Sequence, residues 1–221
     1  MPRRLPSDRE PPSSLPLDGL GAMTADALVP GADLEAADLA DLDLGGRDAT
    51  GASLDGCRLV RCELDGLQLT RARIRHTLLD DVRATDIRLG DATLDEVLVT
   101  GSRIGALAGS GGEWRDVRLR ATRSNLVDLR GATLANVVLE DCVIDELDLS
   151  GAEVRGMRLP GTTIGTLTVE EARLDRLDLT GGRLTTVRGV GSLRGATVTP
   201  AQLLELAPLL AAHLGIDVRS G

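Results

Sequence analysis

The 221-residue sequence contains no phenylalanine, no tyrosine and no lysine, and its single tryptophan is Trp114. Aromatic side chains bury the largest areas in most globular cores. A core built almost without them must be narrow and filled by one repeated aliphatic shape. All 25 basic residues are arginine, against 34 acidic ones, which gives a formal net charge of −9. This charge argues against direct nucleic-acid binding, because that requires a basic surface.

Targeting and membrane signals are also missing. No apolar run approaches the roughly 18 residues that cross a bilayer, and residues 1–16 lack the apolar core of a signal peptide. Three cysteines in a chain without an export signal indicate free thiols in a reducing compartment. We therefore expect a cytoplasmic protein without membrane contact.

The sequence does contain a repeat of five residues. Between Leu34 and Leu184, every fifth position is a centre, and 26 of the 31 centres are leucine, isoleucine or valine. The residue two before each centre is restricted as well, and it alternates small and large from Ala92 to Val187. Residues two apart in an extended segment point to the same side, so both positions face inward. The other three, rich in Asp, Arg, Gly and Thr, face outward or form turns.

Several repeats share the pattern A-(D/N)-L-x-x: ADLEA at 32–36, ADLAD at 37–41, ASLDG at 52–56, ATLDE at 92–96 and ATLAN at 132–136. Over residues 32–188 the chain resembles the pentapeptide-repeat family. The resemblance implies an all-β, right-handed quadrilateral β-helix in which four repeats form one square coil, so the repeats give about eight coils and a rod about 37 Å long. Each centre then packs against its equivalents 20 residues away, for roughly 1.5–3 kcal/mol apiece. The clearest members of this core ladder are Leu54, Leu94, Leu134, Leu139 and Leu174.

A few repeats depart from the pattern. The irregular centres are Ala49, Ala84, Gly109 and Ser124, and Arg47 stands at an inward position. Residues 105–112 (GALAGSGG) form the weakest stretch. We expect a local bulge or distorted corner there, with Trp114 filling the space that Gly109 and Gly112 leave.

The two ends differ from the repeats. We expect a disordered tail at 1–20, an N-terminal cap segment at 21–31, the β-helix at 32–198, a helical element at 199–215 and a tail at 216–221. Thr199 followed by Pro200 is typical of a helix start, and Pro208 predicts a split into two short helices. The apolar stripe of this element consists of Leu203, Leu206, Ala207, Leu210 and Leu214. Two interpretations stay open: a cap on the last coil, or a cap that also forms a two-fold homodimer, as gyrase-directed family members imply.

Residues that could carry chemistry are few. His76 falls at an exposed corner, and His213 lies in the C-terminal element. The three cysteines, Cys57, Cys62 and Cys142, occupy small inward positions, so we expect packing roles; their spacing is not that of a zinc site.

Other candidate motifs are equally weak. The glycine-rich residues 105–112 are not followed by Lys-Ser or Lys-Thr, so they do not form a phosphate loop. The acidic pairs Asp80–Asp81 and Glu170–Glu171 face outward into solvent, with no pocket around them. We expect no catalytic residue, no cofactor, no metal site and no enzymatic activity.

Two functional hypotheses remain. The first is a non-enzymatic protein-interaction or structural solenoid with an unassigned protein partner. The second follows from the resemblance to quinolone-resistance members of the family: an acidic rod that mimics DNA, binds DNA gyrase or another type II topoisomerase, and protects it from quinolones or other gyrase poisons.

Charge density favours the first hypothesis. Residues 32–186 hold 28 acidic residues and 19 arginines, or one net charge per about 4 Å of rod against one per about 1.7 Å of duplex DNA. Opposite charges also alternate by coil, with Asp38 and Asp41 preceding Arg58 and Arg61. These neighbours predict ion pairs between coils, worth about 0–1 kcal/mol each.

Overall fold

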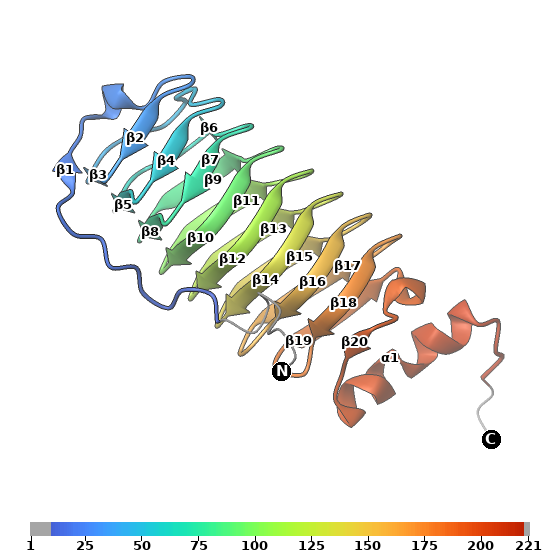
Figure 1. Ribbon diagram of the computed structural model, residues 1–221. Helices are drawn as coiled ribbons and strands as arrows, with labels where there is room; N and C mark the ends of the chain where they lie inside the picture. Colours follow the sequence, from blue (N-terminus) through green and yellow to red (C-terminus); the bar gives the residue numbers. More distant parts are fainter. Residues whose placement is uncertain (1–9, 219–221) are drawn as a thin grey trace, which may run out of the picture.

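The computed structural model of the chain describes residues 10–218 and shows a rod of stacked parallel coils with one helix at its C-terminal end (Figure 1). Each coil advances by 20 residues, so that Trp114 lies between Leu94 and Leu134. The rod makes about nine turns. The β-solenoid predicted from the repeat is confirmed, and it exceeds eight coils because residues 21–22 and 196–197 add strands at its two ends.

Two sheets form the sides of the rod. The larger contains β1 (Gly21–Ala22), β2 (Asp33–Glu35), β3 (Ala37–Ala40), β4 (Ser53–Asp55), β5 (Arg58–Val60), β7 (Arg73–Arg75), β8 (Leu78–Asp80), β10 (Thr93–Thr100), β12 (Glu113–Arg120), β14 (Thr133–Glu140), β16 (Glu153–Arg158), β18 (Arg173–Asp178) and β20 (Ala196–Thr197). The smaller contains β6 (Leu67–Gln68), β9 (Arg83–Arg88), β11 (Arg103–Ala108), β13 (Arg123–Asp128), β15 (Val143–Asp148), β17 (Thr163–Thr168) and β19 (Arg183–Arg188).

The corners between the sides depend on left-handed backbone. Gly46 and Gly66 hold one corner with φ of +66° and +68°, a conformation that glycine reaches without a Cβ clash. From Asp86 onward the equivalent positions lie inside six-residue strands such as β9. The cross-section of the rod therefore changes after its first coils, and long continuous strands replace pairs of short ones.

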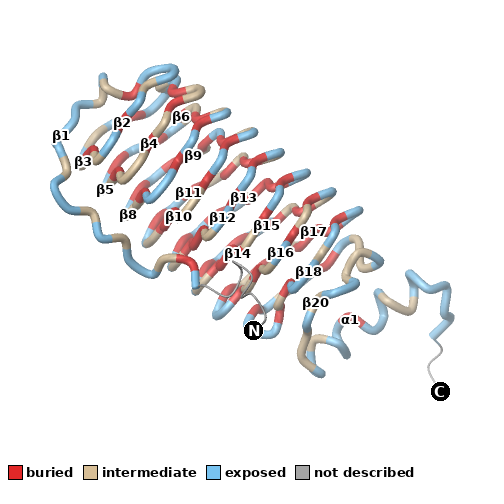
Figure 2. The backbone as a smooth tube through the Cα atoms, viewed as in Figure 1, coloured by how far each residue is buried: buried red, intermediate tan, exposed pale blue. Residues whose placement is uncertain are grey.

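The inward-facing side chains form one continuous aliphatic column, seen as the regularly spaced buried positions in Figure 2. Leu54, Leu94, Leu134 and Leu139 are buried in it. Leu174 is only half-buried, near the C-terminal end of the stack.

The glycine-rich stretch does not distort the rod, contrary to the bulge or distorted corner expected there. β11 keeps its register with both neighbouring strands, and the amide of Gly109 donates to the carbonyl of Asp128 at 2.8 Å. Trp114 is buried beside Gly109 and Gly112, as predicted, because both glycines lack the Cβ that would crowd its ring. Here a bulky residue and two glycines compensate one another without a change of backbone.

The C-terminal end is covered by η3 (Val190–Ser192) and α1 (Pro200–His213). Thr199 and Gln202 form a capping box at the start of α1. The side-chain amide of Gln202 also donates to the carbonyls of Leu179 (2.7 Å) and Gly182 (2.8 Å). This residue thus ties the helix to the last coil. It also satisfies the Gly182 carbonyl, whose equivalent one coil earlier, Thr162, accepts from the amide of Arg183 on the next coil.

Pro208 does not split this element, so the prediction of two short helices is wrong: α1 is continuous through it. Proline removes one backbone donor from a helix interior. The amide that Pro208 lacks would have donated to the carbonyl of Leu204. Both residues lie on the exposed side of α1, so water can donate to that carbonyl instead and the loss is tolerable. Within residues 10–218, no helix is long and apolar enough to cross a membrane.

Candidate interaction surface

One row of outward-facing residues runs along the rod at 20-residue spacing and differs from the others. We call it the Arg118 row; in register it comprises Asp38, Arg58, Leu78, Leu98, Arg118, Val138, Arg158 and Asp178. Its three central members, Leu98, Arg118 and Val138, are buried although they point away from the core. In the part of the chain that the structure describes, no other outward row has three successive buried members.

The N-terminal segment, residues 10–17, lies along this row and crosses the strands from β14 toward the start of the rod (Figure 1). Glu10 forms ion pairs with Arg118 at 2.9 Å and with Arg158 at 2.8 Å. The carbonyl of Pro11 accepts a hydrogen bond from Arg118 at 3.1 Å, and Pro11 is buried. Residues 10–17 thus lie against the rod, in a range where a disordered tail was expected; residues 1–9 of that expectation lie outside the described residues.

Arg118 is the anchor of this contact. Its side chain is only 8 % exposed and binds Glu140 at 2.6 Å on the following coil as well as Glu10. Its Nε atom is buried and has no hydrogen-bond partner among the described residues. A buried guanidinium depends strongly on its carboxylates, since removing one leaves charge in an apolar setting.

The electrostatics of Glu10 reflect the same arrangement. Its hydrogen bond to Arg158 is the largest influence, and together with Arg118 it holds the pKa of Glu10 below 4.5 against the opposing effect of burial. The Glu10 side chain itself remains 66 % exposed. The contact is therefore dry on the side of Arg118 and open to solvent on the side of Glu10.

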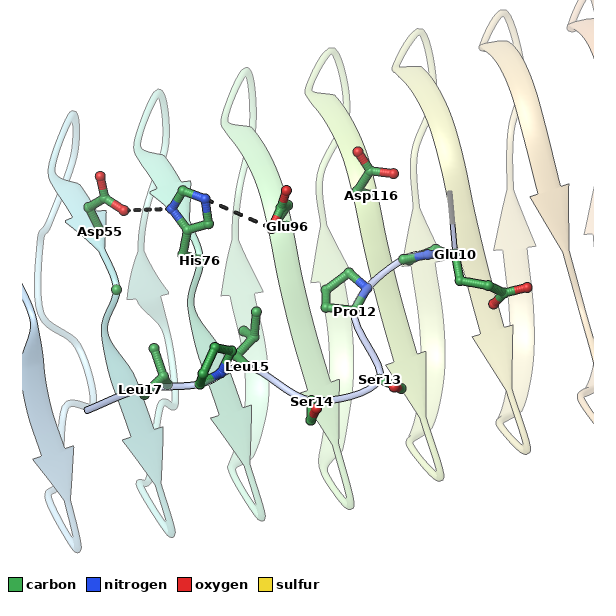
Figure 3. A pocket seen from close by; sticks show the side chains of 13 residues that line it. Glu10, Pro12, Ser13, Ser14, Leu15, Leu17, Asp55, His76, Glu96 and Asp116 are labelled. Atoms are coloured by element: carbon green, nitrogen blue, oxygen red, sulfur yellow. Dashed lines mark hydrogen bonds and ion pairs between the residues drawn. The ribbon is translucent and has the colours of Figure 1, made fainter. Parts of the chain in front are cut away.

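A groove of about 570 Å³ opens between this segment and one corner of the rod. The segment supplies residues 10–17 to one wall, and the other wall consists of Asp55, Gly56, His76, Glu96 and Asp116 (Figure 3). His76 Nδ1 lies 2.9 Å from Asp55 Oδ1, and Nε2 lies 3.9 Å from Glu96 Oε2. The corner therefore places an imidazole between carboxylates of the coils on either side.

The described part of the groove does not bring a serine side chain to His76. His76 is exposed, as expected from its corner position. Ser13 and Ser14 line the same groove, but in the view of Figure 3 their side chains point away from the His76 ring, whereas a nucleophile needs its base within hydrogen-bond reach. Within residues 10–218, no three His, Cys, Asp or Glu side chains gather in a way that could hold a metal ion.

Ion pairs also join neighbouring coils, as the alternating charges predict, both within the Arg118 row and beside it. Arg58 binds Asp38 at 2.6 Å and Arg61 binds Asp41 at 2.6 Å. Hydrogen bonding by Arg58 and by Arg61 lowers the pKa of Asp38 and of Asp41 respectively. Much of the acidic charge is thus matched locally by arginine.

The cysteines lie in the core. Cys57, Cys62 and Cys142 are buried free thiols, and each sulfur donates to backbone carbonyls, such as that of Leu34 for Cys57 at 3.4 Å. Burial raises the pKa of all three thiols. They pack in the small inward positions where the sequence places them.

Other residues that the sequence singled out lie far from the groove. Arg47 is half-buried and pairs with Asp26, in the short helix η2 (Ala25–Ala27) over the first coil, at 3.0 Å. His213 stands at the end of α1, close to Gly191 of η3. Glu170 and Glu171 are exposed.

The apolar stripe expected on the C-terminal element is divided by the structure. Leu206 is buried and Leu210 is half-buried against the last coil, whereas Leu203 and Leu214 are 50 % and 70 % exposed. Leu204, outside the predicted stripe, is 76 % exposed. The helix therefore caps the rod with one face and presents apolar side chains on another.

Comparison with known proteins agrees with the coil geometry. A family model described as pentapeptide repeats matches residues 43–81 and 125–159, in eight copies. No curated protein matches the sequence.

Two solved structures illustrate the likeness. A trypsin-treated variant of QnrB1, described as a plasmid-mediated fluoroquinolone resistance protein, is 16 % identical, with 85 % of this chain and 100 % of that chain covered and a TM-score of 0.42. HetL, described as a pentapeptide repeat protein involved in heterocyst differentiation regulation from the cyanobacterium Nostoc sp. strain PCC 7120, is 21 % identical, with coverages of 79 % and 81 % and a TM-score of 0.33.

Proposed function

Because the chain belongs to the pentapeptide-repeat family, whose model recognises two stretches of its rod, we propose that it is a non-enzymatic protein-binding module that engages its partner through the outer surface. The observation that carries this proposal is the Arg118 row, where outward residues hold an extended polypeptide segment through Arg118 and Arg158. The interior is filled by aliphatic side chains. Only the outer surface is therefore free to bind a partner, as in other solenoids.

Site-specific photo-cross-linking in the host cell tests this proposal. A photoreactive residue replaces one residue at a time. Four of the positions lie on the four sides of one coil, Arg115, Arg120, Asn125 and Arg130, and the fifth, Leu204, lies on α1. We expect discrete protein adducts from one side or from the helix. The Leu139→Asp chain, which we expect to unfold, identifies non-specific adducts. Adducts at no position, or the same adducts from the unfolded chain, would contradict the proposal.

A second candidate is the DNA-mimicking gyrase binder, which the net charge of −9 favours. The exposed Leu203, Leu204 and Leu214 support the homodimer that would lengthen such a rod. The arginine partners of Asp38 and Asp41 weaken it, because they break the negative surface that DNA would present.

Gyrase assays separate the two candidates. If the second is right, low-micromolar protein alters supercoiling by DNA gyrase or its poisoning by a fluoroquinolone, and Leu204→Glu converts a dimer to a monomer in light scattering. No effect on either gyrase activity removes the second candidate and leaves the first in place.

A further inference from the structure

The burial of Leu98, Arg118 and Val138 is unusual for their positions. The members of the same row farther along the rod in either direction, Asp38 and Asp178, are charged, as outward positions normally are. Leu98 and Val138 flank Arg118 on adjacent coils, so together they form an apolar strip with a cation at its centre. Such a strip suits a peptide that brings both apolar side chains and a carboxylate.

The segment that covers this strip has that composition, EPPSSLPL at residues 10–17. Its prolines favour an extended backbone and lack amide donors. The hydrogen bonds to the solenoid described for it come from two arginine side chains, to Glu10 and to the Pro11 carbonyl. Backbone pairing with the coils begins at Gly21, whose amide donates to the carbonyl of Ala36.

These contacts can be exchanged for those of another chain. Glu10 bridges Arg118 and Arg158, so it sits about six coils from β1, a distance of roughly 29 Å at ~4.8 Å per coil. The eleven residue-to-residue steps from Glu10 to Gly21 span about 36 Å when the chain is extended. The segment can therefore leave the Arg118 row without pulling β1 from the end of the rod.

We propose that the Arg118 row is a docking surface for an extended, proline-containing partner peptide with a carboxylate, and that residues 10–17 occupy this surface in cis. The inference rests on the proposed function, and it names the side of the rod and the chemistry of the partner. The partner's carboxylate replaces Glu10 between Arg118 and Arg158, and its apolar side chains replace the segment over Leu98 and Val138. Binding requires displacement of the N-terminal segment, which acts as a built-in competitor.

The test uses the full chain and a fluorescent peptide with the sequence of residues 10–18, EPPSSLPLD. A tethered competitor acts at an effective concentration that can reach millimolar, so it masks the surface from a free peptide. We expect Glu10→Gln to increase the affinity for the peptide by about tenfold or more over the wild type. Glu113→Gln, an exposed change of the same charge on the adjacent side of β12, serves as the matched control and should bind as the wild type does.

Two further variants examine the anchor. Adding Arg158→Gln to Glu10→Gln should remove most of the gain, and Arg158 is a suitable site because its side chain is 42 % exposed and not needed by the core. In a separate chain, a fluorophore on Ser13→Cys reports the segment directly, because the three native thiols are buried. Its anisotropy should fall when Glu10→Gln is introduced.

Equal peptide affinity for the wild type and Glu10→Gln, or no binding to either, would overturn the inference, as would a wild-type dimer that exchanges the segment between copies. These outcomes are distinct from failure of the proposed function. Cross-links confined to a side of the rod other than the Arg118 row would refute this surface and still support a protein-binding module.

Discussion

Gly109 and Trp114 share one space in the core: a Cβ on Gly109 would lie 3.0 Å from Cζ2 of the indole ring. The two residues stand at successive centres of the repeat, where leucine is usual. The absent side chain of one therefore accommodates the excess volume of the other. The indole Nε1 is buried without a hydrogen-bond partner in the described part of the chain, which adds a polar cost to this solution.

This relationship predicts that substitutions at Gly109 and Trp114 have non-additive effects on the free energy of unfolding. Gly109→Ala crowds the ring and should lower the free energy of unfolding by about 1–3 kcal/mol, and Trp114→Leu should also destabilise by leaving a cavity. The double variant should be more stable than the sum of the two losses by about 1 kcal/mol, because leucine makes room for the new methyl group. Urea unfolding followed by circular dichroism measures all three; strict additivity would show that the two residues do not share the space.

The sequence predicts the rod well because its signal is local and repeated. A leucine such as Leu134 is identical in role to Leu94 and Leu54, so one pattern read 31 times specifies register and core together. The two predictions that are wrong concern features whose effect depends on neighbouring residues. The glycines of 105–112 suggested a bulge, but the adjacent Trp114 restores the packing; Pro208 suggested a break, but exposure makes its missing donor tolerable.

The contact of the N-terminal segment could not be predicted in the same way. Glu10 and Arg118 are 108 residues apart, and residues 10–17 have the proline- and serine-rich composition of a linker. A partial signal was nevertheless present. At 20-residue spacing, the sequence places the apolar residues Leu78, Leu98 and Val138 at outward positions of the Arg118 row. This indicates that another part of a polypeptide covers the row, but it does not identify that part.

Leu139→Asp tests the assignment of the centres to the core. Leu139 is fully buried between equivalents on adjacent coils, so an aspartate there must be ionised in an apolar column or protonated at a cost. We expect loss of the cooperative thermal transition, or a decrease in stability above about 4 kcal/mol. Val143→Asp, at an exposed outward position on β15, should change stability by less than about 0.5 kcal/mol. Unchanged melting of Leu139→Asp would refute the core assignment.

The pair Asp38–Arg58 predicts a small effect of pH. The hydrogen bond from Arg58 lowers the pKa of Asp38 in the folded state below its usual 3.8. A depressed pKa stabilises the fold above the unfolded value, and that contribution is lost as the pH falls through the folded pKa. Arg58→Gln should therefore raise the pKa of Asp38, measured by NMR titration of the carboxyl carbon, while stability at neutral pH changes by at most about 1 kcal/mol because the pair is partly solvated. An unmoved Asp38 titration would contradict the pairing.

Because the three cysteine thiols are buried, we expect them to react slowly with thiol reagents in the folded protein. Burial raises the pKa of Cys142 and encloses its sulfur, so little reactive thiolate reaches solvent at neutral pH. In the native protein we expect none of the three cysteines to react with a disulfide reagent within minutes, and all three to react in denaturant. Thr133→Cys, at an exposed position of β14, should add one rapidly reacting thiol. Fast native reaction of any original cysteine would show that the coils open at that point.

At the corner residue Ala121, we expect substitution by glycine to stabilise the fold. Its φ is +49°, a left-handed conformation that costs an L-residue with a Cβ roughly 1–2 kcal/mol. The equivalent corner positions one coil earlier and two coils later are Gly101 and Gly161, so the backbone path accepts glycine there. Ala121→Gly should raise the free energy of unfolding by up to about 1 kcal/mol, since glycine removes the strain but loses more entropy on folding.

The matched control is Ala106→Gly, in the middle of β11, where the backbone is an ordinary strand. There the same loss of a methyl group should destabilise by about 0.5–1 kcal/mol, because no strain is relieved. Chemical unfolding of the two variants should therefore give changes of opposite sign. If both variants lose stability equally, the left-handed corner carries no strain and the repeat tolerates alanine there for another reason.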